Sequence, residues 1–142
     1  MYNPTRSQAR DFFFAAWAGY RAGTPLSDLE RIAVEIIALH PEYHALLEAR
    51  ERYVERDYTP EQGETNPFLH LSMHLAIEEQ LSIDQPPGIL AAFKLLQSRR
   101  ADRHDALHAV LECLGEMLWR AQRSKLPPDG EAYIDCVRRK AG

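Results

Sequence analysis

Apolar residues recur at every third or fourth position along most of the chain, and this spacing is typical of amphipathic α-helices. No segment alternates apolar and polar residues with the period of two that marks a half-buried β-strand. The pattern predicts helices over residues 7–21, 27–40, 43–54, 66–83, 89–97, 103–125 and 131–139. We therefore expect an all-α fold, a helical bundle of about five to six helices with short loops, in which 27–54 counts as one helix interrupted at Pro41.

Residues that begin and end helices support these boundaries. Ser27 and Glu30 have the spacing of a capping box, and Asn66 and Asp102 are good N-cap residues. The stretch 57–65 has turn composition and is predicted to be a loop. It does not read as a domain boundary, so the prediction is a single helical domain over residues 1–142.

Composition and charge exclude several classes of function. The 142 residues are 45% hydrophobic and 27% charged, as in an ordinary globular protein. A formal net charge of −4 and the lack of a basic stripe argue against nucleic acid as a partner. We therefore expect no nucleic-acid binding.

The cysteines and the first residues of the chain indicate the cellular compartment in which the protein is expected. Cys113 and Cys136 form no C-x-x-C motif, and we expect them to be reduced thiols that fill the core. The first eleven residues have no apolar segment typical of a secretory signal, and the aromatic run 12–20 is too short to span a bilayer. These observations predict a cytoplasmic protein without a membrane segment.

All six histidines fall into three copies of the pattern H-x-x-x-H-x-x-x-E. The copies are His40, His44 and Glu48; His70, His74 and Glu78; and His104, His108 and Glu112. Random placement would give only roughly 0.2 histidine pairs at this helical spacing. Because residues four apart share one face of a helix, each copy presents its side chains together, and the histidines project onto the apolar, core-facing sides.

Such a set of inward imidazoles predicts a metal site. Neutral imidazole binds transition metals, and glutamate can complete or bridge the coordination sphere. The hypothesis is a mono- or dinuclear site for Fe, Zn or Mn, with an open position for O₂, NO or peroxide, or for a water molecule that the metal activates for hydrolysis. The candidate ligands are His40, His44, His70, His74, Glu78, His104, His108 and Glu112, of which His40 is the least secure because Pro41 follows it.

Two alternatives remain open. In the first, the protein is a non-enzymatic helical adaptor or homodimer, the histidines form a structural hydrogen-bond network, and the aromatic helix that includes Phe12 to Tyr20 forms the interface. In the second, the His104-Asp105 dipeptide belongs to a metal-dependent phosphohydrolase, with Arg100 or Arg103 near the phosphate. The small-molecule ligand and the reaction are not predicted by the sequence.

Three stretches of the chain resemble a family of small bacterial proteins catalogued as a domain of unknown function. They are HPEYHALLE, NPFLHLSMHLAIEEQLSIDQPPGI and ECLGEMLW, and the resemblance covers nearly the whole chain. It implies a compact helical protein and assigns no catalytic residue. The H-x-x-x-H and H-x-x-x-E steps also look like those of hemerythrin-like and DinB-like proteins, which hold non-haem metal, although three equal copies do not reproduce the ligand order of hemerythrins.

Overall fold

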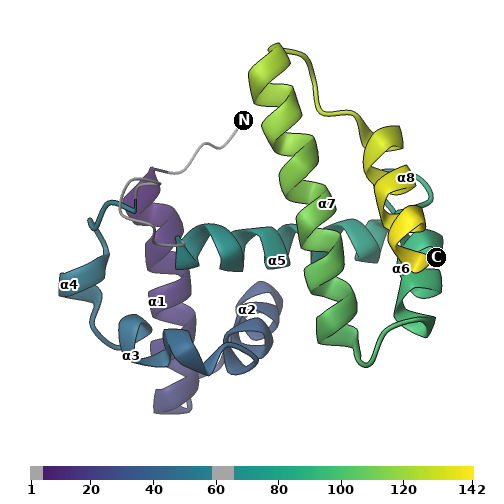
Figure 1. Cartoon of the computed structure of the whole chain (residues 1–142). Coiled ribbons are helices and arrows are strands. Elements are labelled where there is room, and N and C mark those ends of the chain that lie inside the picture. The colour runs from purple at the N-terminus through teal and green to yellow at the C-terminus, as the bar shows by residue number, and fades with distance from the viewer. Residues whose placement is uncertain (1–4, 59–65) are drawn as a thin grey trace. The chain divides into compact units, whose positions relative to one another are not determined.

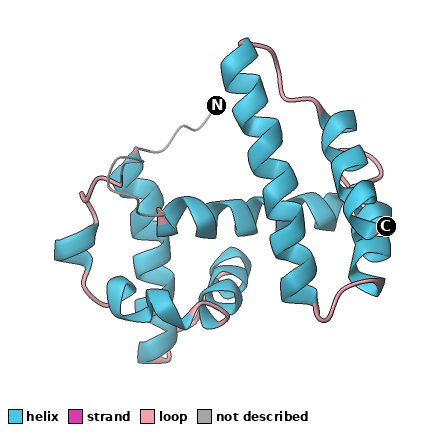
Figure 2. Ribbon diagram, viewed as in Figure 1, coloured by secondary structure: helices cyan, strands magenta, loops and turns pink. Residues whose placement is uncertain are grey.

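The computed structural model describes residues 5–58 and 66–142, and it contains only helices and loops within these ranges (Figures 1 and 2). The all-α prediction is confirmed. The described part of the chain forms eight α-helices and one 3₁₀ turn: α1 (Arg6–Ala22), α2 (Asp28–Ala38), η1 (Pro41–Tyr43), α3 (His44–Leu47), α4 (Arg50–Tyr53), α5 (Pro67–Ile83), α6 (Ile89–Ser98), α7 (Arg103–Ser124) and α8 (Gly130–Ala141).

The prediction of five to six helices is wrong for this reason: the chain after Pro41 does not resume one long helix. It forms the 3₁₀ turn η1 and two four-residue helices, α3 and α4. Neither short helix has a side-chain hydrogen bond at its N-cap. The predicted loop at 57–65 lies mostly outside the described residues, since the structure describes only its first two positions.

Capping side chains place the other helix starts where the sequence predicts them. Ser27 and Glu30 form a reciprocal capping box at α2, and Thr5 forms another with Gln8 at α1. The Asn66 side chain accepts hydrogen bonds from the backbone of residues 68 and 69 at 3.0 and 3.2 Å, and Asp102 caps α7. These side chains satisfy N–H groups that have no partner inside the helix.

The chain divides into two compact units, residues 1–75 and 76–142. Helix α5 runs through the boundary, so its first half belongs to the first unit and its second half to the second. The single-domain organisation stays a prediction.

The first unit has an aromatic and aliphatic core. Its buried side chains come mainly from α1 and α2, with further members from α3, from the residue after α4 and from the start of α5: Phe13, Phe14, Ala16, Trp17, Ala33, Val34, Ile36, Ile37, Leu47, Val54, Phe68 and Leu71. Trp17 is only 6% exposed. The aromatic residues of α1 therefore serve mainly to pack its own unit, which favours the core interpretation of this helix.

Arg10 is a charged residue inside this core, and only 3% of it is exposed. Its Nη1 atom donates to the carbonyl oxygens of Tyr53, Val54 and Arg56 at 3.3, 3.1 and 2.7 Å. The guanidinium also lies 4.6 Å from the centre of the Phe68 ring. Burial lowers the pKa of Arg10, while the carbonyl groups at the end of α4 supply the acceptors that a buried cation needs. Sequence reasoning did not identify this residue.

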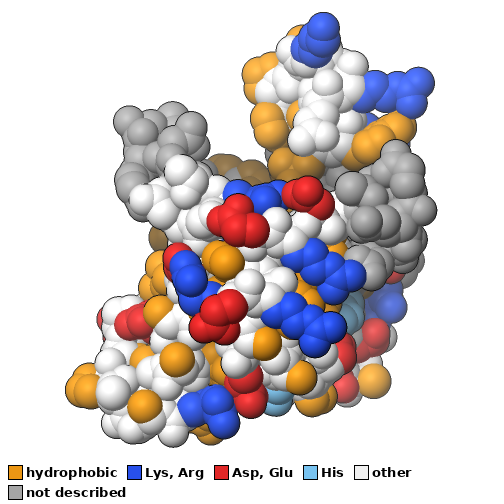
Figure 3. All heavy atoms as spheres, turned by 90° about the vertical axis from the view of Figure 1, so that its left-hand side faces the viewer, with side chains coloured by type: hydrophobic (Ala, Val, Ile, Leu, Met, Phe, Trp, Pro, Cys, Tyr) orange, Lys and Arg blue, Asp and Glu red, His pale blue; other side chains and the backbone are white. Residues whose placement is uncertain are grey.

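Acidic and basic side chains lie next to one another on the face of the molecule shown in Figure 3. In the first unit the guanidinium of Arg50 donates two hydrogen bonds to the carboxylate of Asp11, at 2.5 and 3.0 Å. Arg6 Nη1 lies 2.5 Å from Asp57 Oδ1. Such exposed pairs contribute little to stability, about 0–1 kcal/mol each.

The second unit consists of the end of α5 and of α6, α7 and α8, with α8 packed against both α6 and α7 (Figure 1). The side chain of Asp84 connects α5 to α6, because it accepts from the backbone N–H groups of Gly88 and Leu90 at 3.2 and 3.0 Å. Asp84 itself has a positive φ of 50°, and the Gln85–Pro86 peptide bond is cis. At the other end, Arg99 donates to the carbonyl of Ala141 at 3.1 Å.

Cys113 on α7 and Cys136 on α8 form a disulfide, with their Cα atoms 5.8 Å apart. The prediction of two reduced cysteines is therefore wrong. Each residue was correctly expected on the buried side of its helix, but the sequence does not show that α7 and α8 bring these two positions together.

Two large apolar residues of α7, Leu118 and Trp119, are exposed. Helix α7 has 22 residues, whereas α6 has 10 and α8 has 12. At about 1.5 Å per residue, the C-terminal turns of α7 extend beyond what its shorter neighbours can cover. Leu29 of α2 is also exposed. No helix among the described residues is long and apolar enough to cross a membrane.

We expect Arg10→Met to lower the free energy of unfolding by about 2–4 kcal/mol, because three carbonyl groups lose a charged donor. Arg10→Lys should recover only part of this loss, since one ammonium group cannot reproduce the flat guanidinium over Phe68. Urea unfolding monitored by circular dichroism measures both variants. Wild-type stability in Arg10→Met would contradict the proposed anchoring role.

We expect reduction of the Cys113–Cys136 disulfide to lower the free energy of unfolding by about 3 kcal/mol. The reason is that the cross-link joins two residues 23 positions apart and so restricts the unfolded chain. Urea unfolding of the oxidised and reduced wild-type chains gives this difference directly. Cys113→Ser/Cys136→Ser is the control, since a reducing agent should leave its stability unchanged. Equal stability of the oxidised and reduced chains would contradict the prediction.

Candidate metal centre

The site begins where α2 ends. The helix stops at Ala38, and Pro41 prevents its continuation because a proline ring disfavours helical backbone at the preceding residue. His40, that preceding residue, has φ −127° and ψ 67°. The sequence expectation that His40 lies at a junction between two helical segments is confirmed.

Two histidines donate additional hydrogen bonds to carbonyl groups near the end of α2. His40 Nδ1 lies 2.7 Å from the carbonyl oxygen of Ile36, and His44 Nε2 lies 2.8 Å from that of Ile37. A carbonyl oxygen only accepts, so these two ring nitrogens carry the proton. In the neutral rings, the lone pairs are then on His40 Nε2 and on His44 Nδ1, an assignment that follows from the hydrogen-bond partners.

Helix α5 brings two more imidazoles to His40. His70 and His74 are one helical turn apart, and their ring centres are 4.8 Å apart. The His40 ring lies 4.9 Å from that of His70 and 4.8 Å from that of His74. Each of the three rings thus contacts the other two, and His40 and His74 are buried.

The nitrogen atoms of this triangle are close enough to share one ion. The ligand atoms of His40, His70 and His74 all lie within 4.8 Å of one another. The Nε2 atoms of His40 and His70 are 3.1 Å apart. In a tetrahedral zinc site with Zn–N bonds of about 2.0–2.1 Å, neighbouring nitrogens are about 3.3–3.4 Å apart. The separation of the His40 and His70 nitrogens is thus close to that of two ligands of one ion, and the three histidines together could hold one.

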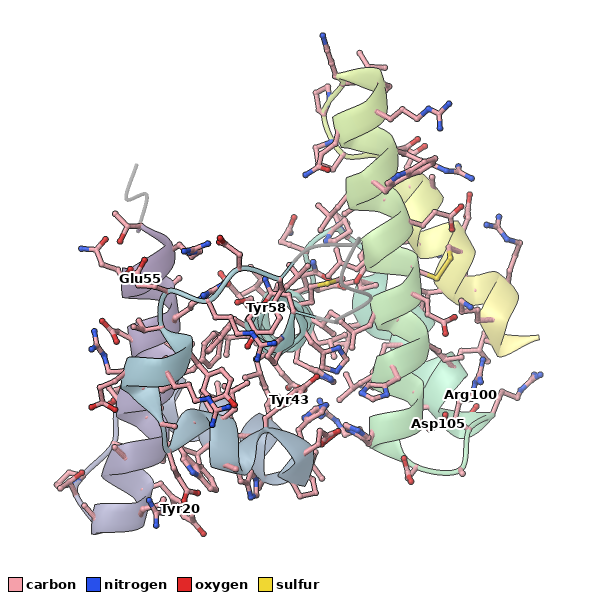
Figure 4. All side chains as sticks on the ribbon, turned by 60° about the vertical axis from the view of Figure 1, so that its left-hand side comes forward. Tyr20, Tyr43, Glu55, Tyr58, Arg100 and Asp105 are labelled. Atoms are coloured by element: carbon pink, nitrogen blue, oxygen red, sulfur yellow. A yellow bond between two sulfur atoms is a disulfide. The ribbon has the colours of Figure 1, made fainter. Side chains whose placement is uncertain are left out.

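Tyr43 lies beside the triangle, one 3₁₀ turn after His40 (Figure 4). Its ring is parallel to that of His40, with the centres 5.5 Å apart, and its centre is 6.1 Å from that of His70. Burial raises the pKa of the Tyr43 phenol, and the charge of Glu42 adds to this effect. The phenol is thus a neutral hydrogen-bond donor. Sequence reasoning missed this residue, although the sequence shows it three positions after His40, which is one turn of a 3₁₀ helix.

His44 does not join the triangle. Its ring packs on Trp17, with the centres 4.4 Å apart, while its Nε2 atom donates to Ile37. The indole N–H of Trp17 in turn donates to Glu48 at 3.2 Å. The first copy of the sequence pattern therefore separates into two parts, with His40 in the histidine cluster and His44 against the aromatic core.

The candidates in the second unit have other contacts within that unit. His104 and His108 lie on adjacent turns of α7, and their ring centres are 4.1 Å apart. The guanidinium of Arg103 donates two hydrogen bonds to the carboxylate of Glu78, at 2.8 and 3.1 Å, and Lys140 donates to Glu112 at 2.6 Å. The two glutamates thus have cationic partners.

The geometry gives no support to a phosphohydrolase built on Asp105. This residue is exposed at the start of α7 (Figure 4). Of the arginines expected near a phosphate, Arg103 is engaged by Glu78, and Arg100 donates to the carbonyl of Lys140 at 3.2 Å.

Comparison with protein families agrees with a helical protein whose activity is unassigned. The family model described as Domain of unknown function (DUF1841) matches residues 5–139. The chain belongs to this family. The resemblance inferred from the three sequence stretches is therefore confirmed, and all three histidines of the cluster lie inside the part of the chain that matches the DUF1841 model.

No curated protein and no solved structure matches the chain significantly. The evidence on the chemistry of this DUF1841 protein therefore comes from its own residues.

The pair formed by Glu112 and Lys140 provides a test that depends on pH. Its hydrogen bond and the charge of Lys140 lower the pKa of Glu112 below the ordinary 4.5. The stabilisation is therefore fully present above pH 4.5 and is lost as the pH falls through the lowered pKa. We expect Glu112→Gln to cost about 0.5 kcal/mol of unfolding free energy at pH 7 and nothing at about pH 3, because an exposed pair contributes little.

Urea unfolding at the two pH values measures this difference. Glu79→Gln, which removes the same charge from an exposed position of α5, is the control for net charge. An equal effect of Glu112→Gln at both pH values would show that the ion pair is not responsible.

Proposed function

We propose that this chain binds one divalent transition metal ion through His40, His70 and His74. The observation that carries the proposal is the mutual contact of the three imidazoles, with the Nε2 atoms of His40 and His70 3.1 Å apart. Three imidazoles leave at least one coordination position for another ligand, as in catalytic zinc sites. The site that we propose is mononuclear, because the three ligands provided by the first unit suffice for one ion.

The donor set favours zinc or iron. Neutral imidazole suits both metals, whereas manganese prefers oxygen ligands. The hydrogen bond from His40 Nδ1 to Ile36 supports the proposal further, since metal-binding histidines usually donate their other N–H group to a carbonyl or carboxylate. Bound at this site, iron would supply an open position for O₂, NO or peroxide, and zinc would activate a water molecule.

Further ligands remain a prediction from the sequence. The sequence pattern offers His104 and His108 as further candidates. Glu78 and Glu112 are weaker candidates, because their carboxylates are paired with Arg103 and Lys140. His44 is also weaker, because its Nε2 atom is engaged by Ile37.

A second candidate function is a purely structural one, in a helical adaptor or homodimer. It is favoured by the hydrogen bonds that His40 makes without any ion. Ile36 accepts from Nδ1, and the distance of 3.1 Å to His70 also suits a hydrogen bond from His70 Nε2–H to His40 Nε2. Metal binding would require His70 to move that proton to its other nitrogen, so that both lone pairs face the ion.

Metal content distinguishes the two functions. The untagged full chain is loaded with Zn(II), or with Fe(II) under anaerobic conditions, and desalted before elemental analysis. We expect about one ion per chain in the wild type, and a large loss of metal in His70→Ala and His74→Ala, because each removes one of three ligands. Less than a tenth of an ion per wild-type chain would overturn the proposal and favour the structural network.

His44→Ala is the matched control. It removes an imidazole that, like that of His40, donates a hydrogen bond to a carbonyl group of α2, but it leaves the triangle intact. It should lower stability and retain about one ion per chain. His108→Ala tests the additional ligand, because a weaker metal affinity in this variant would add the second unit to the coordination sphere.

A further inference from the structure

A cavity of about 310 Å³ lies in the second unit between α7 and α8. Its apolar lining includes Met117 and Ala121, and the buried Tyr133 forms part of the wall. The volume is at the lower end of the range for small-molecule sites. The cavity is independent of the histidine cluster described above, since its lining residues all belong to α7, α8 and the segment between them.

Both cysteines of the disulfide line this cavity. Figure 4 shows the bond in yellow beside α8. Both residues are buried, and Cys136 is the less completely buried of the two, at 8% exposed against 1% for Cys113. We therefore expect a thiol in the cavity to attack Cys136. Access to one sulfur is a requirement for thiol–disulfide exchange.

Charged residues of both signs complete the lining. Arg120 and Arg139 are the cations, and Glu116, Asp129 and Asp135 are the anions. Glu116 is paired with Arg120 at 2.6 Å, and its carboxylate lies 3.9 Å from Cys136 Sγ. Such a lining complements a small molecule that carries both carboxylate and ammonium groups.

Helix α8 has other attachments that would keep it in place after the disulfide opens. The Tyr133 hydroxyl donates to Gln80 at 2.6 Å, and Lys140 pairs with Glu112 at 2.6 Å. Arg99 and Arg100 donate to the last carbonyl groups of α8 at 3.1 and 3.2 Å. The disulfide can therefore open and close in a folded chain.

We infer that the Cys113–Cys136 disulfide is a thiol-exchange site for a low-molecular-weight zwitterionic thiol that binds in this cavity. The thiolate of the small molecule attacks Cys136 Sγ and forms a mixed disulfide. The bond to Cys113 breaks, and the electron pair leaves on Cys113 Sγ, which takes a proton. A second small thiol then attacks the sulfur of the first, releasing the small disulfide and the Cys136 thiolate, which is protonated in turn. Two thiols are oxidised, and the protein disulfide is reduced by two electrons.

The test uses the oxidised full chain and reduced glutathione, a tripeptide thiol with two carboxylates and one ammonium group. Free cysteines are trapped with iodoacetamide and counted by mass spectrometry. We expect both cysteines to be alkylated while the far-ultraviolet circular dichroism stays unchanged, with a rate that saturates as the glutathione concentration rises. The experiment is run in a chelator, so that its outcome does not depend on the proposed metal.

2-Mercaptoethanol is the comparison reagent, because it lacks the charged groups. At equal thiolate concentration it should react more slowly and without saturation. Arg139→Gln should raise the glutathione concentration for half-maximal rate several-fold, whereas Arg123→Gln, a basic residue of α7 outside the cavity lining, should not. Exchange that requires denaturant, or equal rates with both reagents, would overturn the inference.

Discussion

The end of α2 is the constraint on which the histidine cluster depends. The carbonyl groups of Ile36 and Ile37 accept the backbone N–H groups of Leu39 and His40, and each also accepts a second hydrogen bond from an imidazole. The second donors are His40 Nδ1 for Ile36 and His44 Nε2 for Ile37. One consequence is structural, since both rings are fixed against the helix end. The other is chemical, because the bond at His40 Nδ1 leaves the Nε2 lone pair directed at the rings of α5.

Helical periodicity was sufficient to predict the elements that have strong start signals. The helices beginning after Ser27, Asn66 and Asp102 appear where their caps require. Periodicity failed after Pro41, because residues 43–54 keep helical spacing although the chain forms two short helices there. The break between the two lies at Glu48 and Ala49, where Ala49 leaves the helical region with φ −129° and ψ 61°. Helix propensity is a local property, and it does not mark this break.

The candidate site shows the same division between local and long-range information. The spacing of four residues correctly predicted that His70 lies beside His74 and His104 beside His108, because both pairs lie on continuous helices. The same spacing predicts that His44 lies with His40, but the structure separates them, since the chain changes from a 3₁₀ turn to a helix between them. Pairing of Cys113 with Cys136 also depended on the packing of α7 against α8, which no motif within either helix encodes. Contacts between distant segments were thus the part that the sequence pattern could not supply.

Within the cluster, the His40 Nε2 lone pair is the group for which several partners compete. The N–H group of His70, a metal ion and a proton would all bind it, and each excludes the others. A metal ion differs from the other two because it would be held by three lone pairs at once. The hydrogen bond to His70 is neutral and weak, with a net contribution of about 0.5–1.5 kcal/mol. In the site that we propose, coordination by three imidazoles would replace that bond, with the lone pairs of His70 and His74 turned toward the ion.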